Sequence, residues 1–316
     1  MRGISSGRAT ASPSFLSSSS AGYLAVLIAA AWWGTSGLFV KYIASQASIS
    51  PIALAFWRDL LTFLTLLIGV GVVRPAALRI HREDVPRLAA MGATLGAFHV
   101  FWNLGVLLNG AAVATVQQAA APAVVVIVAW MVWREPLTGR KFLAIGLTFA
   151  GTVLVSRIGA SDQTPFSLAG VLVGFCLPLT YAGWILFGKS VRKPYSPFVM
   201  LTYGFAFGAL TLLPLQFLVE QPWTAPVSLW IGFAGWIVQT IIAFAAYLFG
   251  LGKLSAGVAS ILAMSEIAFV SLYAYSLLGE RFSWIQLCGV ALVVGGVGLL
   301  VQIRIQRSPR THSDPF

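Results

Sequence analysis

The most constraining feature of this sequence is a segment that occurs twice. Residues 109–156 match residues 254–301 when they are aligned about 145 positions apart, which places Glu135 on Glu280. Each copy contains small residues, an apolar run, a short turn with the glutamate and then a second apolar run. A repeat of this length predicts that the chain folds as two related halves.

Apolar runs fill most of the chain. It is 58% hydrophobic and only 9% charged, whereas a soluble domain carries about 25% charged residues. A run of about 20 apolar residues crosses a bilayer core roughly 30 Å thick. Because backbone in lipid must form its hydrogen bonds within its own segment, these runs predict an all-α integral membrane protein. Ten such runs occur, at 22–44, 51–72, 85–108, 112–133, 138–158, 166–188, 196–219, 225–250, 255–278 and 283–303.

The number of runs in each half predicts how the halves are related. Five helices is an odd number, so the second half enters the membrane from the opposite side. We expect two inverted five-helix repeats, 22–158 and 166–303, around a central cavity, an arrangement typical of transporters. The Ser-rich residues 1–21 are expected to form a flexible cytoplasmic tail, with a cleaved signal peptide as the alternative. Residues 304–316 are expected to form a basic cytoplasmic tail.

The net charge of +11 would suit a nucleic-acid-binding protein, but its distribution argues against one. Lysine and arginine gather in the connections on one side of the predicted membrane, as the positive-inside rule describes. We therefore expect both termini in the cytoplasm, an inner (plasma) membrane location and no nucleic-acid partner. The basic residues on that side are Arg2, Arg8, Arg74, Arg79, Arg82, Arg87, Arg134, Arg140, Lys141, Lys189, Arg192, Lys193, Lys253, Arg304, Arg307 and Arg310.

Polar and aromatic residues share one face of the third run. His99, Trp102 and Asn103 are three and four positions apart, which places them together on a helix. In the alignment of the two halves at the same offset, His99 corresponds to Phe244 and Trp102 corresponds to Tyr247. This face is either an aromatic stripe between helices or the wall of a cavity. His99 is correspondingly either a core residue or a proton carrier.

Ionisable residues and prolines within the runs mark further candidate positions. Glu266 lies near the membrane midplane, where it would bind a substrate ammonium or a proton, or tie two helices together. Arg58 and Asp59 are about 100° apart on a helix and need not pair. Arg58 either bonds loop carbonyls near the outer end or takes part, with Asp59, in gating or coupling. Pro122 and Pro178 each remove a backbone hydrogen bond and are candidate gating positions.

Two local motifs suggest enzymes and are weak. Residues 183–190 match the phosphate-binding loop letter by letter, but bulky apolar residues inside a predicted span occupy the loop positions. Residues 34–37, Gly-Thr-Ser-Gly, resemble the nucleophile motif of intramembrane proteases. That reading needs hydrogen-bond contact between Ser36 and a base such as His99. Both cysteines lie within apolar runs, so no disulfide, metal site or cofactor is indicated.

Glycine pairs four positions apart indicate close helix packing. Gly92 and Gly96 lie in the third run, and Gly204 and Gly208 lie in the seventh. Small residues at this spacing let two helix backbones approach each other within a membrane. We expect these glycines to serve packing.

Taken together, these motifs resemble the drug/metabolite transporter superfamily, and within it the EamA-type ten-helix exporters. The resemblance rests on Trp33-Gly34-Thr35, on Arg58, and on the paired glutamate turns followed by glycine-rich runs. The chain departs from the pattern at Arg134, where a glycine is usual, and at Ile267, where a proline is common. More narrowly, it is similar to bacterial aromatic amino acid exporters.

The resemblance implies a secondary transporter that exports aromatic or other neutral amino acids by alternating access, with no enzymatic activity. Its driving force is either proton antiport through Glu266 or His99, or facilitated efflux. The alternative is another metabolite or drug. A nucleotide sugar or phosphorylated compound would need several cations at mid-depth in the membrane, where the runs offer only Arg58. Residues expected to line the cavity are Trp33, His99, Trp102, Asn103, Gln118, Trp184, Tyr247 and Glu266.

Overall fold

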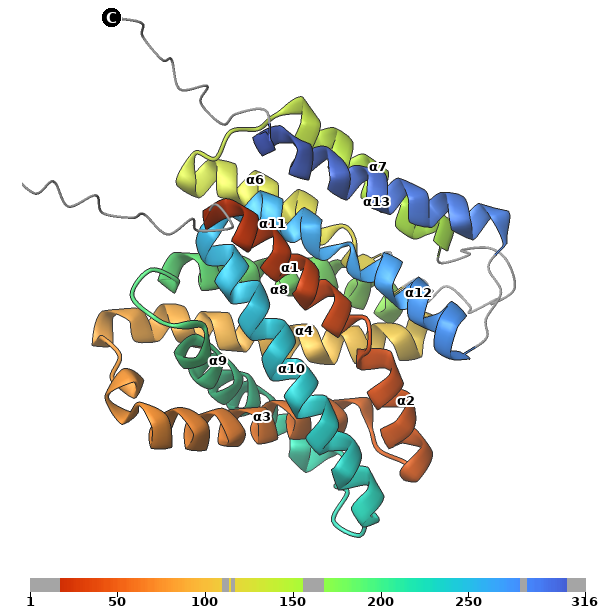
Figure 1. Cartoon of the computed structure of the whole chain (residues 1–316). Helices are drawn as coiled ribbons and strands as arrows, with labels where there is room; N and C mark the ends of the chain where they lie inside the picture. Colours follow the sequence, from red (N-terminus) through yellow and green to blue (C-terminus); the bar gives the residue numbers. More distant parts are fainter. Residues whose placement is uncertain (1–17, 110–113, 115–116, 156–167, 279–282, 306–316) are drawn as a thin grey trace, which may run out of the picture.

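The computed structural model describes residues 18–109, 114, 117–155, 168–278 and 283–305. Across these residues all regular structure is helical, and Figure 1 shows the helices packed side by side. Glu280 and nearly all of both predicted tails lie outside the described residues.

The first half contains six of the described α-helices and two 3-10 turns. They are α1 (Ser18–Trp33), α2 (Ser36–Gln46), α3 (Pro51–Val73), η1 (Pro75–Leu78), η2 (Arg82–Asp84), α4 (Val85–Asn109), α6 (Ala121–Trp133) and α7 (Gly139–Val155). The second half begins with α8 (Leu168–Val191), α9 (Pro197–Leu212), η3 (Leu213–Leu218) and α10 (Val227–Lys253). It ends with α11 (Ala256–Ala263), α12 (Glu266–Leu278) and α13 (Trp284–Ile305).

The lengths and surfaces of these helices are those of a multi-pass membrane protein. Six stretches in the described part of the chain are at least 18 residues long and apolar enough to cross a bilayer. Large apolar side chains face outward, including Phe217 at 86% exposed and Trp284 at 83%. Soluble monomers rarely expose contiguous apolar surface on this scale. The predicted helical membrane fold is confirmed.

Three of the predicted runs are interrupted near their centres. The first breaks between α1 and α2, and the ninth breaks at Met264 and Ser265 between α11 and α12. The fourth has a turn at 119–120 just before α6, at the position that the repeat aligns with the break in the ninth. In the fourth and ninth runs the repeat therefore extends to where the helices break, whereas the counterpart of the first run, α8 in the second half, is continuous.

A residue from the opposite half stabilises the break in the first run. Backbone carbonyls near a helix end lack intrahelical partners, and within a membrane they need another donor. The Trp32 carbonyl accepts locally from the N–H and the hydroxyl of Thr35, at 3.1 and 2.7 Å. The buried Gln239 of α10 adds a donor from the other half: its Nε2 donates to the Trp32 carbonyl at 2.5 Å and to Ser36 Oγ at 3.1 Å. The break is therefore held both by the local contacts of Thr35 and by a contact between the halves.

The helices pair in a pattern that relates the two halves. Helix α3 packs on α9 and α7 on α13, and each pair joins the second or the fifth run to its own counterpart. The pairs α1 with α10 and α4 with α8 are equivalent to each other under the repeat. In Figure 1, α7 and α13 lie together at one edge while α10 runs alongside α1. This reciprocal pattern is the one expected of two halves related by a pseudo-two-fold axis.

The predicted glycine pairs face each other across α4 and α9. A Cβ added to Gly92 would lie 2.5 Å from the Gly204 carbonyl oxygen, and one added to Gly96 would lie 2.8 Å from that of Gly208. Both distances are shorter than any ordinary carbon–oxygen contact. The backbones of α4 and α9 therefore touch directly.

Candidate functional site

A cavity of about 70 Å³ lies between the two halves. Helices α1, α2, α3 and α4 contribute to it from the first half, and α8, α10 and α12 from the second. It lies toward the end of the bundle where α2 connects to α3 and where α10 begins. Its lining residues are Trp33, Ser36, Val40, Ala55, Arg58, Phe98, His99, Trp102, Asn103, Gln118, Tyr181, Trp236, Thr240, Phe244 and Glu266.

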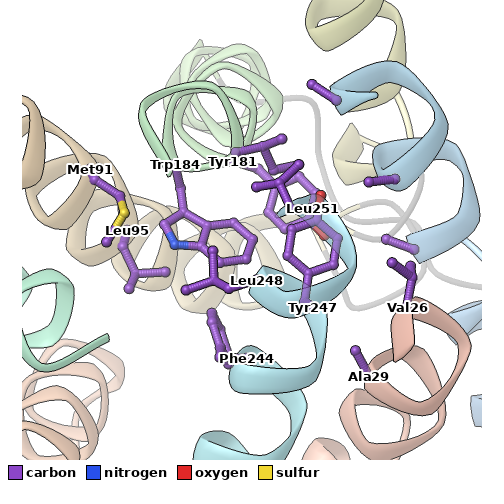
Figure 2. Packing of buried hydrophobic residues seen from close by; sticks show 14 of the residues in the cluster. Val26, Ala29, Met91, Leu95, Tyr181, Trp184, Phe244, Tyr247, Leu248 and Leu251 are labelled. Atoms are coloured by element: carbon purple, nitrogen blue, oxygen red, sulfur yellow. The ribbon is translucent and has the colours of Figure 1, made fainter. Parts of the chain in front are cut away.

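Six of the eight residues expected at the cavity line it, and two do not. The six are Trp33, His99, Trp102, Asn103, Gln118 and Glu266. Trp184 and Tyr247 are instead fully buried in the hydrophobic core, where their rings stack with centroids 5.1 Å apart (Figure 2). The expectation that these two face the cavity is therefore corrected: they form the layer behind it.

That second layer holds in place the aromatic wall of the cavity. We use this name for the aromatic side chains of the lining, which are Trp33, Phe98, Trp102, Tyr181, Trp236 and Phe244. Trp33 contacts Trp184 with ring centroids 6.2 Å apart and Tyr247 at 5.2 Å. Phe244, which also lines the cavity, packs edge-on against both Trp33 and Trp184 at 5.1 Å. Edge-to-face packing at these distances stabilises each pair by about 0.5–1.5 kcal/mol beyond its buried area. The wall is thus fixed by rings that a substrate would not touch.

Arg58, Asp59 and His99 form a buried cluster at the cavity. His99 Nδ1 lies 2.8 Å from Asp59 Oδ1 and 3.0 Å from Oδ2, and the Asp59 side chain is completely buried. Arg58 Nε lies 3.6 Å from Asp59 Oδ1, and its guanidinium sits 4.8 Å above the ring of Trp236. The sequence left the pairing of these neighbours open, and the structure pairs them. Among the described residues Arg58 bonds no loop carbonyl, so that alternative is corrected, while a role in gating or coupling stays a prediction.

Several lining residues carry buried polar atoms that have no hydrogen-bond partner within the described chain. These atoms are Trp33 Nε1, Arg58 Nη2, His99 Nε2, Tyr181 Oη and Trp236 Nε1. Buried polar atoms are almost always hydrogen-bonded in proteins, so a cluster of orphans calls for a ligand or water. Indole and guanidinium nitrogens only donate, so the set favours a partner rich in acceptors.

Other polar lining residues are already engaged. Asn103 Nδ2 donates to the Pro51 carbonyl at 2.7 Å, which ties α4 to the start of α3. Ser36 Oγ accepts from Gln239, and His99 uses its Nδ1 for Asp59 while its Nε2 has no partner among the described residues. Ser36 and His99 therefore do not form the nucleophile–base pair that an intramembrane hydrolase requires.

The two prolines expected to take part in gating occupy different settings. Pro122 is the second residue of α6, directly after the turn at 119–120, where a missing backbone N–H costs nothing. Pro178 lies inside α8, which continues through it. Across the described residues, no group of three or more His, Cys, Asp or Glu side chains is placed to hold a metal ion.

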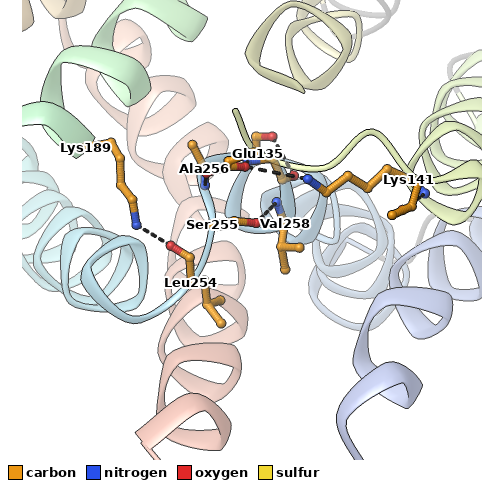
Figure 3. Close-up of polar contacts among 10 residues, drawn as sticks. Glu135, Lys141, Lys189, Leu254, Ser255, Ala256 and Val258 are labelled. Atoms are coloured by element: carbon orange, nitrogen blue, oxygen red, sulfur yellow. Dashed lines mark hydrogen bonds and ion pairs between the residues drawn. The ribbon is translucent and has the colours of Figure 1, made fainter. Parts of the chain in front are cut away.

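At the end of the bundle opposite the cavity, two charged side chains complement the turn from α10 to α11 (Figure 3). Lys189 Nζ donates to the carbonyls of Leu251 and Leu254, at the C-terminus of α10. Glu135 accepts from the backbone N–H of Ala256 at 3.0 Å, at the N-terminus of α11, and lies 3.6 Å from Lys141. A cation thus meets the negative end of one helix dipole and an anion meets the positive end of the next.

Known proteins resemble this chain over nearly its whole length. The model of the EamA-like transporter family matches residues 20–157 and, a second time, residues 168–302. A solved crystal structure shares the fold with a TM-score of 0.76, covering 92% of this chain and 99% of that one at 18% sequence identity.

Several curated relatives are named as transporters. One from Archaeoglobus fulgidus, named an uncharacterized transporter, is 29% identical across 89% of this chain and 99% of its own. The uncharacterized transporter YwfM of Bacillus subtilis is 27% identical across 91% and 95%. A probable terminal-alkyne amino-acid exporter of Streptantibioticus cattleyicolor is 25% identical across 90% and 89%. The narrower similarity to aromatic amino acid exporters stays a prediction, whereas the family follows from the double match: this chain belongs to the EamA-like transporter family.

Proposed function

We propose that this protein is a secondary transporter that exports aromatic or other neutral amino acids across the inner membrane by alternating access. The observation that carries the proposal is one cavity between the halves whose described lining combines an aromatic wall with a single cation, Arg58, and a single anion, Glu266. Aromatic rings bind apolar side chains with loose selectivity, while one charge of each sign matches the zwitterionic backbone of an amino acid. The relative named a probable amino-acid exporter supports the same substrate class.

In this proposal the basic end of the bundle faces the cytoplasm together with both termini. The cavity then lies on the outer side, while fully buried side chains such as Met91, Leu95 and Leu251 fill the cytoplasmic half (Figure 2). Export requires a second state in which this packing opens and the outer side closes. Phosphorylated metabolites suit the cavity poorly, because its described lining holds one cation.

Counterflow of labelled phenylalanine into liposomes that contain the purified protein tests the function. We expect saturable exchange by the wild type and a loss of about tenfold or more in Trp102→Ala, because truncating an aromatic wall removes contacts to the substrate ring. Glu266→Gln should lose exchange to a similar extent. Trp284→Ala, on an exposed side chain that is not part of the cavity lining, serves as the control and should match the wild type.

Repeating the assay with and without a pH gradient separates proton antiport from facilitated efflux. If wild-type liposomes exchange no more phenylalanine than empty ones, the amino acid proposal fails.

A further inference from the structure

The cavity holds its one described cation in an unusual setting. Arg58 leans on Asp59 through Nε, at 3.6 Å, and its guanidinium is stacked over the ring of Trp236. A guanidinium is a planar fork with five N–H donors, and stacking on an aromatic face fixes the plane of that fork. Arg58 Nη2 nevertheless has no hydrogen-bond partner among the described residues. The donor is therefore positioned without being used.

Asp59 and His99 explain how the Arg58 guanidinium is positioned, but they do not bind its unused N–H donor. The His99 ring contacts the Asp59 carboxylate through Nδ1, at 2.8 Å from Oδ1. On α9, Gly208 leaves space for that carboxylate, since a Cβ there would lie 3.0 Å from Asp59 Oδ2. A buried carboxylate supported in this way attracts the neighbouring guanidinium and orients it. Asp59 is thus a positioning residue. Arg58 Nη2 still lacks an acceptor for its hydrogen bond.

Glu266 provides the opposite charge at a different element of the same cavity. It is the first residue of α12, directly after the helix break at Met264 and Ser265. The structure gives Glu266 no ion pair with Arg58 or with any other described cation, although both residues line one cavity. Glu266 therefore has no ionic partner among the described residues, and an unpaired charge in a membrane interior is costly. Arg58 is balanced in charge by Asp59 but keeps an unused donor, so one ligand that offers a cation to Glu266 and acceptors to Arg58 satisfies both.

Resting on the function proposed above, we propose that Arg58 binds the substrate carboxylate and Glu266 binds the substrate ammonium, so that the transported class is the α-amino acid zwitterion with an apolar side chain. The indole N–H of Trp236 beside Arg58 completes the carboxylate site, and the rings of Trp33 and Phe244 receive the side chain. A compound that carries only a carboxylate would bind Arg58 but not Glu266, and a compound that carries only an ammonium would bind Glu266 but not Arg58.

Three probes that share one phenyl ring test this assignment: phenylalanine, 3-phenylpropionate, which lacks the ammonium, and 2-phenylethylamine, which lacks the carboxylate. Affinities are measured by titration calorimetry on purified protein in nanodiscs. In Glu266→Gln, we expect phenylalanine and phenylethylamine to bind about tenfold more weakly and phenylpropionate to be unchanged. Loss of a charge-assisted contact has this magnitude.

Removing Arg58 alone would leave Asp59 as an uncompensated buried charge, so the test uses a neutral background. The variant Asp59→Asn keeps Arg58 and is the reference. Adding Arg58→Met to it should weaken phenylalanine and phenylpropionate about tenfold and leave phenylethylamine unchanged, again by the loss of one charge-assisted contact. Gel filtration and thermal unfolding establish that both variants are folded.

The outcomes separate the inference from the function on which it rests. A crossed pattern of losses supports the charge assignment even if phenylalanine is not transported. Equal weakening of all three probes by Arg58→Met, or no weakening of any, overturns it even if counterflow succeeds. If none of the probes binds the wild type, both proposals fall.

Discussion

Replacing Gly96 with leucine is expected to prevent the protein from folding. A Cβ at this position would lie 2.8 Å from the Gly208 carbonyl oxygen and 3.0 Å from its Cα, so the obstruction is backbone, which cannot rotate away. Overpacking typically costs about 1–3 kcal/mol even where side chains can shift, and here α4 and α9 would have to separate. Gel filtration of the detergent-solubilised protein should show aggregate and no monodisperse peak.

The matched control is Gly69→Leu on α3. Gly69 is also a glycine within a membrane-spanning helix, but it is exposed and a Cβ there meets no atom within 4 Å. This variant should elute as the wild type does. A folded Gly96→Leu protein with normal thermal stability would contradict the close contact between α4 and α9.

The second large effect is expected at the turn between α10 and α11. Lys189→Met leaves the carbonyls of Leu251 and Leu254 without their donor, and such a loss within a protein interior costs about 1–3 kcal/mol. Glu135→Ala removes the acceptor for the N–H groups of Ala256 and Gly257 and should have a similar cost. Both variants should lower the midpoint of thermal unfolding, while Lys193→Met, on an exposed lysine at the same end, should not.

Exchanging the two charges distinguishes helix capping from a simple ion pair. If Lys189 and Glu135 acted mainly on each other, the double variant Lys189→Glu with Glu135→Lys would restore stability. The contacts predict the reverse, because the exchange places an anion at the C-terminus of α10 and a cation at the N-terminus of α11, each against the helix dipole. Restoration of the wild-type midpoint would contradict this account.

The sequence alone predicts the helical membrane fold, because hydropathy and an internal repeat are properties of the chain itself. It does not predict the breaks within the runs. The break between α1 and α2 is stabilised in part by Gln239, which reaches Trp32 from another helix 207 residues away. No local signal announces such a contact. The break before Glu266 contains neither glycine nor proline, and only its alignment with residues 119–120 hints at it.

The cavity lining is predictable only in part, because the sequence shows which residues share a helix face but not how deeply each one is buried. Helical spacing shows that His99, Trp102 and Asn103 share a face, and all three line the cavity. Spacing does not show depth, so sequence reasoning places Trp184 and Tyr247 one layer too far forward. The signal for Phe244 is present, since the repeat aligns it with His99. Trp236 has no such signal, because its role depends on a guanidinium from α3 resting on its ring.

The central claim is that the substrate occupies this cavity, and protection of a single engineered thiol tests it most directly. With Cys176 and Cys288 replaced by serine, Ser36→Cys places one thiol on the cavity lining, and Ser45→Cys, on the exposed end of α2, serves as the control. The account predicts that phenylalanine slows modification of the Ser36→Cys protein by a small maleimide severalfold and leaves the rate for the Ser45→Cys protein unchanged. Equal rates for Ser36→Cys with and without saturating phenylalanine, in protein that still exchanges it, would contradict the claim.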